Sequence, residues 1–362
     1  MLAKLARKIP AGDNWLFEPK WDGFRCIVFR DGDRVDLVSR NLKPLGRYFP
    51  ELTAPLLAAF PDRCVVDGEI VVADGNGDGL DFDALLQRIH PAASRIERLA
   101  DETPASFVAF DVLALGDDAL LDRPMSERRA LLLDAIAPNE VVLLTPASSD
   151  RAVAEEWFGS FEGAGLDGII AKPLDGTYDE GKRSLIKVKH QRSALCAVPG
   201  YRVHKDGNGV GSLLLGLYDA AGDMHSVGVA AAFSVARRSE LLAELEPRTN
   251  DALVDHPWQS WAAHQVGQAG EPDAGGQTVS TQGGSRWNAG KDLSFVPIQM
   301  GLVAAVTFGQ LEGGRFRHGV SFVEWRPDVE PSACRYDQLD VAAPVDFHEF
   351  LRSSAAAGLC GP

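Results

Sequence analysis

The chain has 362 residues, 45% of them hydrophobic and 24% charged, with a formal net charge of -15. The length exceeds what one core usually supports, so we expect two domains, and the composition is that of an ordinary globular protein. The acidic balance argues against indiscriminate nucleic-acid binding, and the lack of a run of about 18 apolar residues argues against a membrane span.

The first predicted hairpin follows Lys20. Residues 24–29 form an apolar, strand-like run, and the Asp31-Gly32 pair after them is a strong turn signal, so residues 34–41 are expected to be the partner strand. Lys20 would then lie at a rigid strand edge, and Arg40 at the end of the second strand. The pattern Lys-x-Asp-Gly-x-Arg at 20–25 should arise by chance in such a chain about twice per thousand. The pattern is specific enough to support the hypothesis that Lys20 is a functional residue.

Further elements are expected up to residue 198. We predict helices over 48–60, 80–89, 126–136 and 151–164, and strands over 64–72, 106–113, 167–172 and 184–190. The first helix is expected either to be broken by Pro55 or to start there. The strand over 64–72 contains the polar triplet Asp67-Gly68-Glu69, which costs stability in an apolar run unless another group pairs with it. Lys187 and Lys189 are two residues apart on a strand, so both amines should emerge on one face. A solvated strand face is the simpler interpretation of such a pair, and a bound phosphate is the functional one.

From residue 198 onward the pattern is that of an all-β domain. Short strands are expected over 201–204, 212–218, 225–229, 302–308 and 317–325, with one helix over 236–245. This set suits a small closed barrel of the oligonucleotide-binding (OB) type. Residues 265–284 are predicted to be a flexible insertion and the tail after Phe350 to be disordered. The predicted fold class is α+β, with domains 1–198 and 199–345 and a C-terminal tail 346–362.

The charges and cysteines limit the possible sites further. Residues 182–205 contain seven lysines and arginines and no acid, and residues 1–50 contain ten against six acids. These two basic tracts could share one face, although charge alone favours two separate solvated faces. The five cysteines are scattered, odd in number and without a Cys-x-x-Cys pair, which argues against a disulfide framework or a thiolate zinc site. The first eight residues are too short and too charged for a secretory signal, so we expect a cytoplasmic protein.

The chemistry that these residues could perform centres on the Lys20 amine. An ordinary lysine, with a pKa near ~10.4, needs roughly 4 kcal/mol of help to act as a nucleophile at pH 7. Neighbouring cations, such as a metal ion and Lys187 or Lys189, would disfavour the ammonium form. Three carboxylates are hard donors that suit Mg²⁺ or Mn²⁺ together with substrate phosphates: Asp22, Glu69 and Asp167. The residues thus allow attack by Lys20 on a phosphorus atom.

The order of the motifs resembles a known superfamily. Along the chain stand Glu-x-Lys-x-Asp-Gly-x-Arg at 18–25, Asp-Gly-Glu at 67–69, Phe-Asp-Val at 110–112, Asp-Gly-Ile-Ile-Ala-Lys at 167–172 and Lys-Val-Lys at 187–189. The series is similar to that of the covalent nucleotidyltransferases, which include ATP-dependent DNA ligases, RNA ligases and capping enzymes. Residues 200–205, 211–218 and 285–295 look like the bacterial ligase C group. The resemblance extends over about 15–339.

The resemblance implies an ATP-dependent DNA ligase that seals nicks in duplex DNA during repair. It implies that Lys20 becomes adenylated and that AMP passes to the 5′-phosphate of the nick, from which the 3′-hydroxyl displaces it. The implied binding residues for ATP are Glu18 and Phe110 at the adenine, Arg25 and Glu69 at the ribose, and Lys187 and Lys189 at the α-phosphate. Arg40 matches the position for the 5′-phosphate, and Arg326 and Asp328 match the contribution of the barrel. Implied partners are nicked DNA and repair polymerases or primases, and we expect a nucleoid-associated monomer with no membrane contact.

The sequence departs from the family pattern at two positions. Asp167 stands where glutamate is usual, so its carboxylate is one methylene shorter. Val329 stands where a lysine or arginine is usual, and we therefore predict slower self-adenylation, with Arg326 carrying more of the contact to pyrophosphate. Within enzymes the alternative is an RNA ligase or a capping-type enzyme, and outside them a non-catalytic module that binds DNA ends. Lys172 is either a partner for nucleotide phosphates or a solvated strand end.

Overall fold

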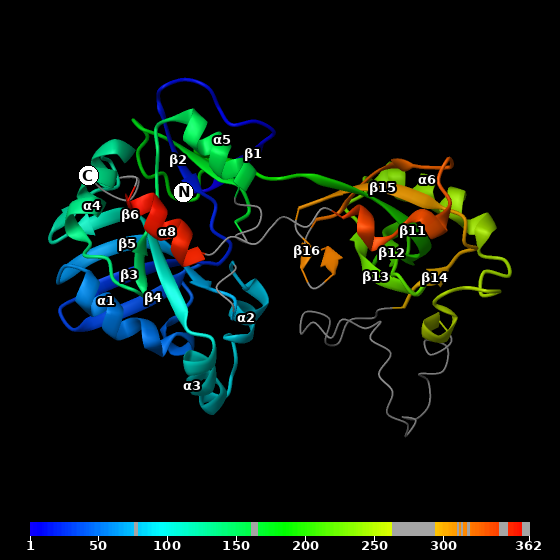
Figure 1. Cartoon of the computed structure of the whole chain (residues 1–362), viewed down its shortest axis with the longest axis horizontal. Helices are drawn as coiled ribbons and strands as arrows, with labels where there is room; N and C mark the ends of the chain where they lie inside the picture. The colour runs from blue at the N-terminus through cyan, green and yellow to red at the C-terminus, as the bar shows by residue number, and fades with distance from the viewer. Residues whose placement is uncertain are drawn as a thin grey trace. The chain divides into compact units, whose positions relative to one another are not determined.

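The computed structural model describes residues 1–75, 79–160, 166–262, 294–309, 311–312, 314–316, 319–339 and 347–356. The chain forms two compact units (Figure 1). The first comprises Met1–His190 and Val341–Pro362, and the second comprises Gln191–Asp340. No helix in the described ranges is long and apolar enough to cross a membrane.

The first unit contains two sheets. The smaller has the order β1-β10-β9-β2, and the larger has the order β4-β3-β5-β6-β7, with β8 pairing in parallel to β6. Their strands are β1 (Ala3–Ala6), β2 (Trp15–Pro19), β9 (Ile169–Pro173) and β10 (Leu185–Val188) in the smaller sheet, and β3 (Phe24–Asp31), β4 (Arg34–Ser39), β5 (Arg63–Val72), β6 (Ala105–Leu115), β7 (Asp118–Ala119) and β8 (Val142–Leu144) in the larger.

The predicted hairpin is present, and its turn explains the register. Gly32 has φ +61°, the left-handed conformation that the turn between β3 and β4 requires. Arg30 pairs with Val35 and Asp31 with Arg34, which sets the register of the two strands. Side chains alternate between the two faces of a strand, so every second residue of β3 points to the core. Cys26 and Val28 are fully buried there, in one cluster with Phe107 of β6.

Helices surround the sheets of the first unit. They are α1 (Thr53–Ala59), α2 (Phe82–Gln87), α3 (Ala93–Glu102), α4 (Met125–Ala135), α5 (Arg151–Ser160) and α8 (Phe347–Ala356), with 3₁₀ turns at Gly46–Tyr48 and Pro50–Leu52. The helix expected over 48–60 is therefore much shorter, because Pro50 begins a separate 3₁₀ turn. Pro55 is accepted in the first turn of α1, where its missing N–H has no helical partner anyway. The expected disorder after Phe350 is wrong for residues 351–356, which belong to α8, and residues 357–362 lie outside the described residues.

The second unit is built on one antiparallel sheet with the order β13-β12-β11-β15-β18, to which β14 adds beside β11. An isolated bridge between Ala230 and Val320 connects the ends of its two outermost strands. The elements are β11 (Arg192–Val203), β12 (Val210–Tyr218), β13 (Met224–Ala230), β14 (Val296–Pro297), β15 (Val303–Phe308), β16 (Leu311–Glu312), β17 (Arg315–Phe316), β18 (Ser321–Trp325), α6 (Val235–Leu245) and 3₁₀ turns at Glu246–Arg248, Pro331–Ala333 and Tyr336–Gln338.

The division between the units differs from the boundary expected at residue 198. Strand β11 is continuous from Arg192 to Val203 and pairs along its length within the sheet of the second unit. The chain therefore changes units before β11 begins, and not within it. The predicted insertion over 265–284 lies outside the described residues.

Candidate active site

A cavity of about 350 Å³ opens in the first unit around Lys20. Eight residues singled out from the sequence line it: Glu18, Lys20, Arg25, Arg40, Glu69, Phe110, Lys172 and Lys187. Residues that the sequence analysis gave no role also line it, among them Asp67, Asp111, Tyr178 and Arg183. The motifs, which are far apart in the chain, thus meet at one cavity that belongs to the first unit alone.

Lys20 is fixed through its backbone and its side chain. It follows β2, its N–H donates to the Gly168 carbonyl at 2.8 Å, and its own carbonyl accepts from the Asp167 N–H at 3.0 Å. Its side chain is 19% exposed, and Nζ lies 2.7 Å from Oδ2 of Asp167. The amine also donates to the Trp21 carbonyl at 3.4 Å. Lys20 therefore does not point into bulk solvent.

Asp167 joins Lys20 to the Lys-x-Lys pair. Its carboxylate also forms an ion pair with Nζ of Lys189, which follows the end of β10. The charges of these two lysines, and the hydrogen bonds from them, hold the pKa of Asp167 below its ordinary value although burial opposes the shift. Burial lowers the pKa of Lys187, and the positive charges of Lys189 and Lys20 lower it further. The site thus contains the expected cluster of cations, with a carboxylate at its centre.

Two motif glycines allow the strands around Lys20 to approach closely. A Cβ at Gly168, where φ is +128°, would collide with the Val188 carbonyl oxygen, one residue before Lys189. A Cβ at Gly23 would collide with the Ile70 carbonyl oxygen and would come within 2.8 Å of Cγ of Glu69. The glycine of each Asp-Gly motif is therefore a consequence of close packing at the cavity.

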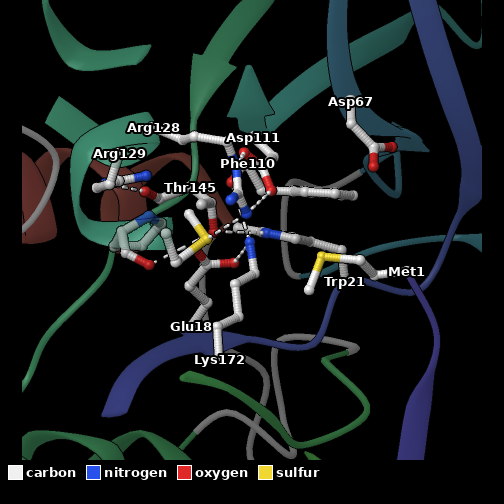
Figure 2. A network of polar contacts seen from close by, with 12 residues as sticks. Met1, Glu18, Trp21, Asp67, Phe110, Asp111, Arg128, Arg129, Thr145 and Lys172 are labelled. Carbon is white, nitrogen blue, oxygen red and sulfur yellow. Dashed lines mark hydrogen bonds and ion pairs between the residues drawn. The ribbon is translucent and has the colours of Figure 1, made fainter. Parts of the chain in front are cut away.

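The side chains of Glu18 and Lys172 point toward each other beside Phe110 (Figure 2). Nζ of Lys172 lies 2.8 Å from Oε2 of Glu18, donates to the Phe110 carbonyl at 2.9 Å and is 4.8 Å from the centre of its ring. Lys172 is 4% exposed and Glu18 is 3% exposed. The solvated strand end is therefore wrong, because Lys172 is buried and forms an ion pair with a buried carboxylate. Its role as a partner for nucleotide phosphates stays a prediction.

One oxygen of Glu18 remains available to a ligand. Oε1 is buried and has no hydrogen-bond partner, while Lys172 holds Oε2. Burial raises the pKa of Glu18, and the positive charge of Lys172 opposes that shift. A buried acceptor without a donor is costly, so the geometry suits a ligand that brings an N–H, such as the amino group of adenine.

Arg25 is held by a network that the sequence analysis missed. Its guanidinium forms a two-pronged contact with Asp67, with Nε to Oδ1 at 2.7 Å and Nη2 to Oδ2 at 2.5 Å. The Tyr178 hydroxyl donates to Oδ2 of Asp67 at 2.7 Å, and the Arg25 guanidinium lies 5.1 Å from the centre of the Phe110 ring. Asp67 is fully buried on β5. Its contacts with Arg25 and Tyr178 explain why an acid is tolerated in that apolar strand. Arg25 and Glu69, the two residues predicted to reach the ribose, lie opposite each other on β3 and β5.

Phe110 is neither a plain core residue nor an isolated stacking platform. It is partly buried, lines the cavity and lies between Arg25 and Lys172. The next residue, Asp111, accepts from Arg128 of α4 at 2.8 Å and 3.0 Å, and both side chains are buried (Figure 2). This buried pair fixes the strand that presents the Phe110 ring.

The carboxylates give only part of a metal site. Burial raises the pKa of Glu69 to about 7. The positive charges of Lys20 and Arg25 oppose this rise, and the negative charges of Asp67 and Asp22 add to it. A divalent cation would relieve the repulsion between Asp22 and Glu69, so these two residues fit one. Asp167 is already neutralised by two lysines. Among the described residues no group of three His, Cys, Asp or Glu side chains could hold a metal ion by itself.

The remaining predicted residues are Arg40 in the first unit and Arg326 and Asp328 in the second. Arg40 is exposed at the lining of the cavity, directly after β4. In the second unit Arg326 forms a two-pronged pair with Asp328, at 2.8 Å and 2.5 Å, and Val329 packs partly buried against the hydrophobic core. Residues 285–293, most of the 285–295 motif, lie outside the described residues.

Comparisons with known proteins agree with this arrangement. Residues 1–189 match the model of the ATP dependent DNA ligase domain. The chain is 54% identical to DNA ligase C of Mycobacterium tuberculosis, over 97% of this chain and 96% of that protein. It is 47% identical to DNA ligase C1 of Mycolicibacterium smegmatis, over 97% of this chain and 96% of that protein.

A solved structure shows the same fold. In a study of Lig E DNA ligases, a chain that is 18% identical aligns with a TM-score of 0.54, covering 90% of this chain and 98% of that one. With the family model matching the whole Lys20 unit up to Lys189, and with near-complete relatives at about half identity, the chain belongs to the ATP-dependent DNA ligases.

Proposed function

We propose that the protein seals nicks in duplex DNA by way of an AMP group carried on Lys20, and that it does so in DNA repair. The observation that carries this proposal is the position of the Lys20 amine, which lines a nucleotide-sized cavity beside Lys187 and is held by Asp167. A lysine held in this way has a defined direction of attack, unlike one on a mobile loop.

The base would bind at the Glu18 end of the cavity. The free Oε1 of Glu18 would accept the adenine amino group, and Phe110 would contact the ring of the base. Arg25, fixed by Asp67, would reach the ribose together with Glu69. The positive charge of Lys172 opposes the burial that raises the pKa of Glu18 and so favours the carboxylate form, an acceptor that suits adenine better than guanine at that position.

In the first step the Lys20 Nζ would attack the α-phosphorus of ATP. A bond from nitrogen to phosphorus forms, and the bond from the α-phosphorus to the bridging oxygen breaks, so that pyrophosphate leaves with the electron pair. The incoming phosphates would contact Lys187 and would compete with Asp167 for Lys189. Once Asp167 loses a cation it becomes a better base, and it lies 2.7 Å from the amine that must lose a proton.

A divalent metal ion fits beside the phosphates, where Asp22 and Glu69 would hold it with oxygens of the substrate. When bound, it would neutralise charge that develops on the leaving pyrophosphate. Asp167 remains a predicted member of the metal set for the states in which its lysines contact phosphate.

The later steps need a DNA end at the same cavity. Arg40, exposed at the lining, would bind the 5′-phosphate of the nick. We infer that the second unit is an OB-fold, because the outermost strands of its sheet are bridged at Ala230 and Val320. In the adenylation step Arg326 would have to exchange Asp328 for pyrophosphate.

The test is to incubate the protein with α-labelled ATP and then to add a nicked duplex. The protein should become labelled, and the label should pass to the DNA before the strand is sealed. Lys20→Ala should abolish labelling, whereas Lys182→Ala should not, because Lys182 is 73% exposed and contacts only Asp179 among the described ion pairs. Label retained by Lys20→Ala would contradict the proposal.

The same assay separates the alternatives. Labelling by GTP instead of ATP would favour a capping-type enzyme, and joining of nicked RNA instead of DNA would favour an RNA ligase. Binding to nicked DNA without any labelling would indicate a non-catalytic end-binding module.

A further inference from the structure

The C-terminal helix α8 packs into the first unit, although the chain reaches it only after the second unit. Figure 1 shows α8, coloured red, among the elements of the first unit. Phe350 is 6% exposed and Leu351 is 8% exposed, and both belong to the hydrophobic cluster that contains Trp21 and Val188. The family model ends at residue 189, so α8 lies beyond the matched domain.

The contact of α8 that matters for chemistry is with Trp21, the residue after Lys20. The ring centres of Trp21 and Phe350 are 6.4 Å apart, with planes inclined at 42°. The indole Nε1 donates to Oγ1 of Thr145 at 2.9 Å, and Thr145 is fully buried. The indole is thus fixed by a hydrogen bond at its polar edge and by an aromatic contact from α8.

Trp21 in turn touches the nucleophile. Its carbonyl accepts the long hydrogen bond from the Lys20 amine at 3.4 Å, and the peptide between the two residues is shared. Because the anchored indole holds the Trp21 backbone in place, loss of a contact to the ring would let that backbone shift, and with it the carbonyl and the peptide joined to Lys20. Displacements of about 1 Å at a reacting group can cost roughly 100-fold in rate.

We propose that α8 is a positioning element for Lys20 and that Phe350 is the positioning residue, acting through Trp21. This inference rests on the proposed adenylation of Lys20. Phe350 does not line the cavity, so it affects the placement of the amine and not the binding of ATP.

The experiment uses the full chain with Phe350→Leu, which keeps an apolar side chain but removes the ring beside Trp21. Phe60→Leu is the matched control. Phe60 is 5% exposed and its ring lies 6.0 Å from that of Phe107, in another hydrophobic cluster of the unit. Single-turnover formation of the Lys20 adduct is measured over a range of ATP concentrations. The amplitude of labelling gives the fraction of the protein that is active.

Phe350→Leu should slow the maximal rate about tenfold or more, with unchanged amplitude and with less than about a twofold change in the half-saturating ATP concentration. Phe350→Trp, which restores a ring, should recover most of the rate. Phe60→Leu should keep the wild-type rate. A wild-type rate in Phe350→Leu, or an equal loss in both leucine variants, would overturn the proposal.

A second readout does not depend on adenylation. Brief acetylation of the free protein, followed by mass spectrometry, gives the reactivity of Lys20 relative to the exposed Lys4. This ratio should change in Phe350→Leu and not in Phe60→Leu. If the wild type is never labelled by ATP, the proposed function fails, while the acetylation ratio still decides whether α8 positions the amine.

Discussion

Replacing Lys172 by methionine tests the buried pair at the base-binding end of the cavity. The substitution conserves most of the volume but leaves the Glu18 carboxylate, 3% exposed, without its cation. Breaking such a pair from one side costs about 3–5 kcal/mol, because the remaining charge stays desolvated. For a unit of about 200 residues this corresponds to a fall in melting temperature on the order of 10 °C.

The effect should depend on pH in a defined direction. Burial raises the pKa of Glu18 in the folded state, and the loss of Lys172 removes the charge that opposes this shift. A carboxyl group with a raised folded pKa binds more protons in the folded state than in the unfolded one, so stability falls as pH rises through that range. The free energy of unfolding of Lys172→Met should therefore be closest to that of the wild type near pH 5 and farthest below it near pH 8.

Urea denaturation at several pH values measures this, with two further variants. Lys182→Met, at an exposed ion pair, should change stability by less than about 1 kcal/mol at every pH. The double variant Glu18→Gln with Lys172→Met should recover most of the loss, since no charge remains buried. A deficit that does not vary with pH, or additive losses in the double variant, would refute the reasoning.

Three other changes test the site. The folded pKa of Glu69 is raised to about 7, so the stability of the wild type should decline between about pH 5 and 7 as the protonated form is lost. Glu69→Gln should remove this decline, measured by urea denaturation. An unchanged pH profile would contradict this. Gly168→Ala should destabilise the first unit by at least about 2 kcal/mol and slow Lys20 labelling, since its Cβ collides with the Val188 carbonyl; wild-type labelling would count against it. Val329→Lys should accelerate self-adenylation in a rapid-quench assay, and an unchanged rate would show that the departure from the family pattern has no effect.

The sequence predicted those parts of the site that depend on local signals. The Asp31-Gly32 turn fixes the β3–β4 hairpin, and the order of the motifs identified the lysines and acids that meet at the cavity. Each of these signals is a short run of residues whose geometry is determined by its neighbours in the chain.

The features that were missed depend on register and on distant contacts. Glu18 and Lys172 meet because Leu16 lies opposite Lys172 on β9, which places the two charged side chains diagonally on one face. Nothing in either strand alone sets that register. Strand β1 has no apolar alternation and is a strand because β10 pairs with it, more than 170 residues later in the chain.

The return of the chain at α8 has a consequence for biosynthesis. A ribosome releases the first 190 residues, then the whole second unit, and only then residues 347–356, which supply Phe350. At about 5–20 residues per second this leaves an interval of roughly 10–30 s. During that interval the surface of Trp21 that α8 will cover is open, so a chaperone can bind the nascent chain there. Lys20 reaches its final position only when translation is nearly complete.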